Sequence, residues 1–227
     1  MRVLALDTAL GAASAGIFDF PEGAVLAQRS QAMERGHAEA LIPMVEGIVG
    51  EIEGGFGSLD RIAVTVGPGS FTGLRVAIAA ARAFALAMDI PVVGVSTLVA
   101  YAAPLLASGS RATVGVAIDA RHGSVFFQSF WLDGRKAFGP ALVTIDQAVT
   151  ELRGGPARLT GSGAALVAAA AGLRGVEAQV VSCNSAPDIA FVARLGAAAD
   201  PALAPSSPLY LRAASAMPQT GGRIARA

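Results

Sequence analysis

The sequence predicts an α/β fold of two similar lobes, each a mixed β-sheet with helices packed against it. Short apolar segments of strand length alternate along the chain with longer segments at helical spacing. Two patterns of strand, turn and helix also occur twice, in the same order. With 227 residues, the chain is long enough for two small lobes that each have a core.

The first half of the chain begins with a predicted β-hairpin. Residues 2–7 and 12–19 are apolar strand candidates separated by a short turn, and a third strand is expected near 24–29. A helix is expected over about 37–52, because apolar residues recur there at helical spacing. The three strands and the helix form the first part of the first lobe.

A parallel unit follows the hairpin and its helix. The segment 61–66 is a strand candidate, 70–88 a helix candidate and 92–96 a further strand candidate. This order predicts a β-α-β unit with a right-handed crossover.

The second half repeats this plan. Residues 116–130 (VAIDARHGSVFFQSF) mirror residues 4–18, since in each a strand ends in Asp and Gly follows after three intervening residues. Residues 158–166 (RLTGSGAAL) mirror the strand, Gly-x-Gly turn and helix start at 64–74. The repeat predicts a duplicated β-β-β-α-β-α lobe, in which a strand within 176–183 and a helix after 186 close the second copy.

The expected domain boundaries follow from this repeat. The first lobe is expected over 1–100 and the second, truncated lobe over 101–212. Residues 213–227 lack apolar periodicity and are expected to be a disordered tail.

The composition limits the classes of function. Lys and Arg number 17, as do Asp and Glu, so a chain that binds nucleic acid by itself is not indicated. Charged residues make up only 15%, which suggests that a partner covers some apolar surface. The single cysteine, Cys183, excludes an internal disulfide framework, and no apolar run approaches the roughly 20 residues of a membrane span. Asp7 argues against a signal peptide, so a cytoplasmic location is expected.

The Gly-Pro-Gly turn in VTVGPGSFTGLR (64–75) leads from a strand into a helix. Its glycines allow positive φ and close approach, and Ser70 is a good N-cap for the helix. One interpretation is a phosphate contact at the helix N-terminus, and the other is a corner that needs small residues for packing. The Lys-Ser/Thr end of a P-loop is absent. The candidate phosphate- or nucleotide-binding residues are Asp7, Thr8, Gly67, Gly69, Ser70 and Asp119.

The helix over 70–88 carries two apolar stripes and only two charged residues, Arg75 and Arg82. The first stripe contains Leu74 and Ile78, and the sheet can cover it. The second is small and apolar and comprises Gly73, Val76, Ala77, Ala80 and Phe84. Either the helix over 37–52 covers this second stripe or a partner does, and we favour a partner.

Asp7 and Asp119 both end a strand and would face each other across a cleft between two lobes. They could hold magnesium there, or each could cap its own turn, which we prefer. His37, His122 and Cys183 do not have metal-ligand spacing, so no metal site is predicted. No nucleophile–base pair indicates a peptidase either.

Several segments together resemble the bacterial TsaB family. They are LALDTALGAASAGIFD, HAEALIPMVEGIV, VTVGPGSFTGLRVAIAAARAFA, IPVVGVSTLVAYA, IDARHGSVFFQSF and PLYLR. This family provides the dimerisation subunit in the biosynthesis of tRNA threonylcarbamoyladenosine, and the resemblance runs from Leu4 to about Arg212. It implies an actin/hexokinase-like (ASKHA) fold of two duplicated lobes.

The resemblance also implies a role without catalysis by this chain alone. TsaD, the related subunit that transfers the threonylcarbamoyl group to the adenosine beside the anticodon, carries a His-x-x-x-His metal pair. Thr97 and Tyr101 stand at these positions here, and neither side chain replaces imidazole as a metal ligand. The resemblance therefore implies no catalytic residues and no required cofactor, with ATP or ADP and magnesium possible at the assembled complex.

The implied partners are TsaD in a heterodimer, TsaE docking on that pair and a second copy when the chain is alone. tRNA would be bound mainly through the complex. The contacts would come from the helices over 37–52 and 70–88. The expected interface residues are His37, Leu41, Val45, Ile48, Thr72, Gly73, Val76, Ala77, Ala80 and Phe84. The alternative is a small nucleotide-dependent kinase or ATPase of the same fold that uses Asp7 and Asp119 with magnesium.

Overall fold

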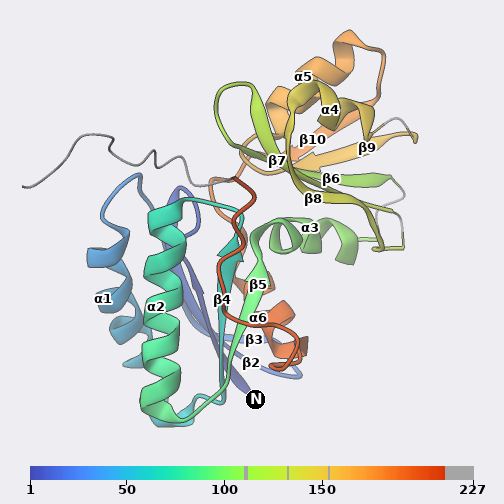
Figure 1. Ribbon diagram of the computed structural model, residues 1–227. Helices are drawn as coiled ribbons and strands as arrows, with labels where there is room; N and C mark the ends of the chain where they lie inside the picture. The colour runs from blue at the N-terminus through green and yellow to red at the C-terminus, as the bar shows by residue number, and fades with distance from the viewer. Residues whose placement is uncertain (110–111, 132, 153, 213–227) are drawn as a thin grey trace, which may run out of the picture.

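A computed structural model describes residues 1–109, 112–131, 133–152 and 154–212 (Figure 1). The expected tail, 213–227, lies outside the described residues. Two sheets lie one above the other in the view of Figure 1, and α3 lies between them.

The first sheet has five strands in the order β3-β2-β1-β4-β5. The β1–β2 and β2–β3 pairs are antiparallel, whereas β4 pairs in parallel with both β1 and β5. The strands are β1 (Arg2–Asp7), β2 (Ala12–Asp19), β3 (Ala24–Ala32), β4 (Arg61–Gly67) and β5 (Val92–Ser96). The predicted hairpin and β-α-β unit are therefore confirmed, with β3 extending three residues past its expected end.

The second sheet repeats this pairing strand for strand. Its order is β10-β9-β6-β7-β8, in which β6–β7 and β7–β8 are antiparallel and β9 pairs in parallel with β6 and β10. The strands are β6 (Thr113–Asp119), β7 (Ser124–Phe130), β8 (Lys136–Thr144), β9 (Ala157–Thr160) and β10 (Ala178–Ser182). The duplication inferred from the sequence is confirmed at the level of topology.

Helices cover both faces of the first sheet. On one face lie α1 (His37–Val49) and α2 (Phe71–Met88), which pack on the inward-facing residues of β1, among them Leu4 and Leu6. On the other face lies α6 (Ile189–Ala198), packed on Val3 and Ala5. Successive residues of β1 point to opposite faces of the sheet. Because helices cover both faces, the side chains on both faces are buried, which explains the unbroken apolar character of RVLALD.

The second sheet is also covered on both faces. The helices α4 (Ile145–Thr150) and α5 (Ala164–Leu173) pack on one face, around Phe127 and Leu159. The helix α3 (Thr97–Ala107) packs on the other, around Val116 and Ile118. Because α3 directly follows β5 of the first sheet, it connects the two lobes.

The position of α6 corrects the expected division of the chain. The helix after residue 186 is expected from the sequence in the second lobe, but α6 packs on β1, β2, β4 and β5 of the first sheet. The Arg61 guanidinium on β4 donates to the carbonyls of Gly196, Ala197 and Ala199, at the end of α6 (3.0, 3.0 and 2.8 Å). After β10 the chain thus returns to the first lobe. There α6 covers the apolar face of the first sheet that α1 and α2 leave uncovered.

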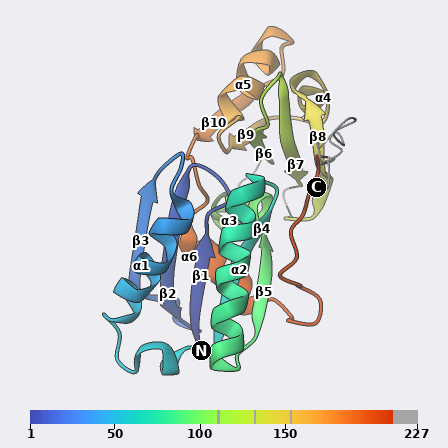
Figure 2. The same cartoon turned by 60° about the vertical axis from the view of Figure 1, so that its left-hand side comes forward.

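The last described residues run back along the first lobe. We call residues 204–212 the C-terminal strap; it passes beside α2 and β5 and reaches the second lobe (Figures 1 and 2). The Gly94 N–H donates to the Ala204 carbonyl, and the Leu209 N–H donates to the Val66 carbonyl (2.9 and 2.7 Å). The strap thus covers the edge strand β5, which would otherwise present unpaired backbone groups.

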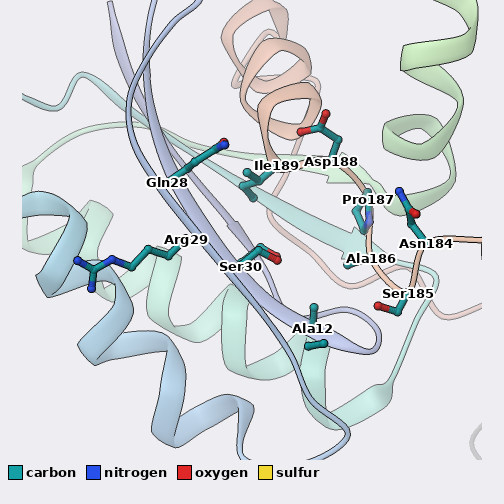
Figure 3. Close-up of a pocket in the computed structure, with 12 residues that line it drawn as sticks. Ala12, Gln28, Arg29, Ser30, Asn184, Ser185, Ala186, Pro187, Asp188 and Ile189 are labelled. Atoms are coloured by element: carbon teal, nitrogen blue, oxygen red, sulfur yellow. The ribbon is translucent and has the colours of Figure 1, made fainter.

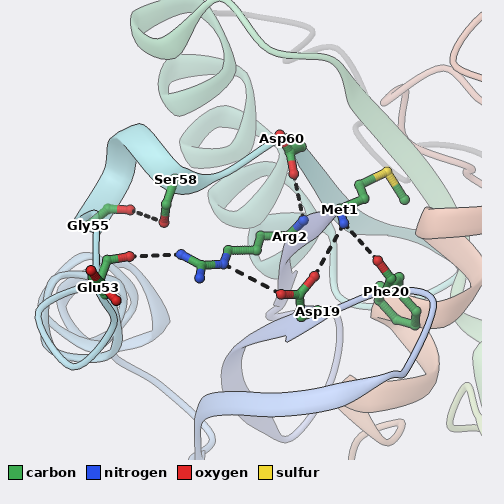
Figure 4. A network of polar contacts seen from close by, with 8 residues as sticks. All are labelled: Met1, Arg2, Asp19, Phe20, Glu53, Gly55, Ser58 and Asp60. Atoms are coloured by element: carbon green, nitrogen blue, oxygen red, sulfur yellow. Dashed lines mark hydrogen bonds and ion pairs between the residues drawn. The ribbon is translucent and has the colours of Figure 1, made fainter.

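Polar contacts fasten the opposite end of the first sheet (Figure 4). The Arg2 N–H donates to the Asp60 carboxylate (2.7 Å), and the Arg2 guanidinium donates to the Glu53 carbonyl (2.8 Å). The Met1 ammonium donates to Asp19 (3.2 Å) and to the Phe20 carbonyl (2.7 Å). These contacts join the start of β1 to the β2–β3 turn and to the segment before β4.

Candidate functional site

An open cleft of about 1360 Å³ lies between the two lobes. Its first-lobe wall contains the Gly-Pro-Gly turn and the N-terminal ends of α1 and α2. Its second-lobe wall contains Asp119 to Arg121 and Ser162, and residues 209–212 of the C-terminal strap complete it. The turn singled out in the sequence therefore lines the cleft that separates the duplicated lobes.

Most contacts of the Gly-Pro-Gly turn are made with its own chain. The Ser70 N–H donates to the Ala9 carbonyl (2.7 Å), and a Cβ on Gly69 would lie 2.4 Å from that same oxygen. Gly67 has a φ of 114°, and a Cβ there would lie 2.8 Å from the Leu209 carbonyl oxygen. Both glycines are thus required by close backbone approach, as in the corner interpretation.

The first turn of α2 is likewise tied to the β1–β2 turn. The Ser70 hydroxyl accepts from the Gly73 N–H (3.3 Å), which confirms Ser70 as the N-cap. The buried Thr8 hydroxyl donates to the Gly73 carbonyl (2.6 Å). A Cβ on Gly73 would lie 2.0 Å from the Thr8 carbonyl oxygen. Thr8, Ser70 and Gly73 therefore have structural roles at this contact.

Asp7 and Asp119 have different environments and do not both line the cleft. Asp119 lines it, and its carboxylate accepts from the Arg121 N–H (2.7 Å). Asp7 is fully buried, and its Oδ1 accepts from the Ala9 N–H (3.2 Å) and the Thr65 hydroxyl. Each aspartate thus caps its own turn, the interpretation that we preferred, and the paired magnesium site of the kinase alternative receives no support from this geometry.

Burial changes the ionisation of Asp7. Desolvation raises the pKa of its carboxyl group from 3.8 to about 6, against the opposing effects of the Thr65 hydroxyl, the Ala9 N–H and the charge of His37. The second carboxyl oxygen, Oδ2, has no hydrogen-bond partner among the described residues. Asp7 is therefore a destabilised buried anion near neutral pH.

Thr97 and Tyr101, which the resemblance places at the positions of the TsaD metal pair, are also buried. Thr97 and Tyr101 lie on α3, and the Tyr101 hydroxyl donates to the Asn184 carbonyl (2.8 Å). Burial, and then the negative charge of Asp7, raise the pKa of Tyr101 far above its usual range. No cluster of three His, Cys, Asp or Glu side chains occurs among the described residues.

The structure corrects much of the expected partner interface. Leu41, Val45 and Ile48 on α1, and Ala77 on α2, are each 0% exposed within one core, and Gly73 is buried. These five residues pack within the chain and are not available for direct contact with a partner. The helices α1 and α2 cover each other and the sheet, which is the alternative that we had favoured less.

The remaining expected interface residues are partly or fully accessible. Thr72 is exposed, and Val76, Ala80 and Phe84 are half-buried. His37 is half-buried at the start of α1, where its Nε2 lies 3.0 Å from the Leu10 carbonyl oxygen. Phe84 stacks on Phe56 with ring centroids 5.5 Å apart, so part of this stripe is also covered from within the chain.

One exposed face of α2 remains. We call it the outer face of α2; its residues are Thr72, Ala79, Ala83 and Leu86. Leu86 is 86% exposed, and Ile42 on the neighbouring α1 is 39% exposed. Helical spacing identified apolar stripes but missed Ala79, Ala83 and Leu86, because periodicity does not tell which stripe the rest of the chain covers.

The length and apolar composition of α2 also meet the criteria used to find membrane-spanning helices. Contrary to the expectation from the sequence, this 18-residue helix is long and apolar enough to cross a membrane by those two criteria alone. Core helices of soluble proteins meet the same criteria. Here Leu74, Ile78 and Ala81 of α2 pack in the core over the first sheet.

A smaller cavity of about 480 Å³ lies between the strands β2 and β3 and the segment 184–189 (Figure 3). It is lined by polar residues of these strands and of 184–188, and the Ser14 and Ser30 hydroxyls are 2.7 Å apart. Arg29 extends away from the other labelled side chains and pairs with Glu51. Within the lining, the Ser14 and Ser30 hydroxyls pair with each other and the Asp188 carboxylate accepts from the Ala190 N–H (2.9 Å), so we assign no site to this cavity.

Comparisons with known proteins agree with the fold. A family model described as TsaD, tRNA N6-adenosine threonylcarbamoyltransferase, matches residues 25–217. YeaZ from Pseudomonas aeruginosa superposes with a TM-score of 0.73 at 25% identity, covering 92% of this chain and 99% of that one. This likeness, with the two sheets of equal topology, confirms the duplicated actin/hexokinase-like fold.

Similar sequences come from several bacteria. An uncharacterized protein of Mycobacterium tuberculosis is 38% identical over 220 residues, which cover 95% of this chain and 94% of that protein. The tRNA threonylcarbamoyladenosine biosynthesis protein TsaB of Escherichia coli is 35% identical over 133 residues, 59% of this chain and 56% of that protein. Haemophilus influenzae TsaB is 29% identical over 174 residues, 72% of each chain.

Proposed function

Because the chain belongs to the TsaD family by its family model and is a TsaB-type member of it, we propose that it is the non-catalytic partner of TsaD in threonylcarbamoyl transfer to tRNA. The TsaB relatives support involvement in tRNA threonylcarbamoyladenosine biosynthesis. The pairing with TsaD, through α1 and α2, is the finer part of the proposal.

The outer face of α2 is the observation that carries this proposal. It presents Ala79, Ala83 and Leu86 to solvent on a helix of which 33% is buried within the chain. Small residues allow the backbone of a partner helix to approach closely, and Leu86 offers a large apolar side chain for burial. A helix of a partner subunit fits this surface, and a second copy would use it when TsaD is absent.

The geometry of the cleft supports a role without catalysis. Asp119 lines the cleft but Asp7 does not, and Thr97 and Tyr101 are buried in α3. These four positions therefore do not bring two carboxylates or a metal pair together at one accessible point. In the proposed complex, TsaD supplies the reacting groups and this chain supplies an ordered helix surface.

The remaining parts of the proposal concern the larger assembly. TsaE would dock on the heterodimer, and ATP or ADP with magnesium would bind at the assembled complex. The formal net charge of zero agrees with tRNA being held mainly by the partner subunits. This chain would need no cofactor, and the reaction would take place in the cytoplasm.

The proposal is tested by changing the outer face of α2. Leu86→Glu and Ala83→Glu place a charge in the proposed interface, and both side chains point to solvent in the single chain. We expect each variant to weaken association with the cognate TsaD by roughly tenfold or more, because a charge would be buried without a partner. Affinity is measured by calorimetric titration.

The matched control is Leu173→Glu, since Leu173 is a 90% exposed leucine on α5 of the other lobe. The three variants should have the melting temperature of the parent protein, and the control should bind TsaD normally. Unchanged affinity of both α2 variants would contradict an interface on this face. ATP turnover by the isolated chain, lost in Asp7→Ala, would instead favour the kinase or ATPase alternative.

A further inference from the structure

The C-terminal strap lies so close to the first sheet that two glycines are needed beneath it. A Cβ on Gly94 would lie 2.4 Å from the Pro205 carbonyl oxygen, and one on Gly67 would lie 2.8 Å from the Leu209 carbonyl oxygen. The backbone hydrogen bonds from the Gly94 N–H to the Ala204 carbonyl and from the Leu209 N–H to the Val66 carbonyl hold the strap in place at these points. The strap is therefore part of the first lobe.

Both charged residues of α2 hold the strap. The Arg82 guanidinium donates to the Ser206 carbonyl and hydroxyl (2.6 and 3.1 Å), and Ser206 is 7% exposed. The Arg75 guanidinium donates to the Tyr210 hydroxyl (3.2 Å) and lies 3.7 Å from the centre of the Phe71 ring. The Phe71 and Tyr210 rings are 5.3 Å apart.

The end of the strap reaches the other side of the cleft. The Arg212 guanidinium donates to the Ala120 carbonyl in the β6–β7 turn of the second lobe (2.8 Å). Residues 209–212 of the strap and Ala120 line the same cleft. Among the described residues, the first lobe holds the strap through several hydrogen bonds, whereas the turn of the second lobe is hydrogen-bonded by the Arg212 side chain alone.

We propose that the strap is an interlobe latch, in which Arg212 bound to the Ala120 carbonyl sets the separation of the two lobes across the cleft. The strap can keep its position on the first lobe when this bond breaks, because its other contacts are to α2, β4 and β5. Loss of the bond would leave α3, residues 183–188 and the packing of Leu10 against the core around α3 to hold the lobes together, and the cleft would open. This inference concerns the chain by itself and does not depend on the proposed partner.

The latch predicts a change in the distance between the lobes when Arg212 is shortened. Spin labels are placed at Glu46→Cys on α1 and Leu173→Cys on α5, both exposed, in a Cys183→Ser background. Double electron–electron resonance is recorded on the full chain diluted with unlabelled protein, so that pairs between two copies contribute little. We expect Arg212→Ala to broaden the distance distribution and to shift it to longer distances.

Two further variants separate the latch from a general effect of removing charge. Arg212→Lys keeps a cationic donor on a long side chain and should restore most of the parent distribution. Arg194→Ala removes an arginine that stacks on Phe191 of α6 within the first lobe, and should leave the distribution unchanged. A distribution for Arg212→Ala that superposes on that of the parent would overturn the proposal. An equal shift in Arg194→Ala would overturn it as well.

Discussion

At the scale of single residues, Asp7 shows how burial changes the behaviour of a carboxyl group at the end of a strand. It ends β1 next to the cleft, but its side chain is fully buried and its Oδ1 is engaged by Ala9 and Thr65. Its folded pKa of about 6 lies above the ordinary value of 3.8, so the folded state binds more protons than the unfolded state between these pH values. Stability from this residue is therefore greatest at low pH and falls as the pH rises through this window.

We predict that Asp7→Asn removes this pH dependence. The amide oxygen can accept both hydrogen bonds of Oδ1, and no charge has to be buried at neutral pH. Relative to the parent protein, the variant should gain about 2 kcal/mol in unfolding free energy between about pH 4 and about pH 7.5, because part of the dependence lies below pH 4. The measurement is urea unfolding of both proteins at both pH values.

Asp119→Asn is the matched control, since Asp119 caps the equivalent turn of the second lobe through the Arg121 N–H and is exposed. It reports the effect of losing a carboxylate from such a turn without burial. A pH profile of Asp7→Asn parallel to that of the parent protein would show that Asp7 is not a buried anion.

The sequence predicted the capping roles of several residues around the cleft but not the reason for its glycines. Ser70 as N-cap and Asp7 and Asp119 as turn caps follow from local chemistry, which a single segment contains. The requirement for glycine at 69 and 73 depends on the β1–β2 turn, which is distant in sequence and fixes the available space. Local patterns therefore identified the turn, and only the packed structure explains why its residues are small.

At the scale of elements, periodicity predicted where helices lie but not what they cover. The helices α1 and α2 occur close to their expected bounds, yet their apolar residues serve one shared core. The helix α6 was expected in the second lobe because it follows β10 in sequence. Its apolar face is matched by Val3, Ala5 and Val93 of the first sheet, a pairing that only the three-dimensional arrangement reveals.

We predict that Gly196→Ala tests this placement of α6. A Cβ at Gly196 would lie 2.2 Å from the Ala63 Cβ on β4, so α6 would have to move away from the sheet. The cost should be about 2–3 kcal/mol of unfolding free energy, as for other overpacked core positions. Denaturant unfolding of the two proteins gives the difference directly.

Gly172→Ala is the matched control, because Gly172 lies in α5 and a Cβ there would contact nothing within 4 Å. Alanine has the higher helix propensity, so this variant should be more stable than the parent protein by about 0.5–1 kcal/mol. If Gly196→Ala were also neutral or stabilising, α6 would not be packed tightly on β4.

At the scale of the whole molecule, the two lobes share one topology but are not two consecutive halves of the chain. The first lobe takes β1 to β5, α1, α2, α6 and the C-terminal strap, so the second sheet is inserted between its parts. The repeat in the sequence predicted the duplicated sheets because strand–turn–helix patterns are local. The repeat did not predict that the chain returns to the first lobe after β10. That return depends on which apolar face of the first sheet the other helices leave uncovered.

This arrangement predicts that the first lobe folds from two separate pieces of the sequence. Residues 1–96 alone leave Val3, Ala5 and Phe18 without α6, so one face of the first sheet would be exposed to water. Joining 1–96 to 186–212 through a flexible Gly-Ser linker supplies α6 and the strap, and should restore the core on that face. We expect the joined chain to unfold cooperatively on heating and to give a dispersed amide NMR spectrum, whereas 1–96 alone should do neither. Cooperative unfolding of 1–96 alone would mean that α6 is dispensable for the lobe, and the division of the chain deduced from the packing of α6 would be wrong.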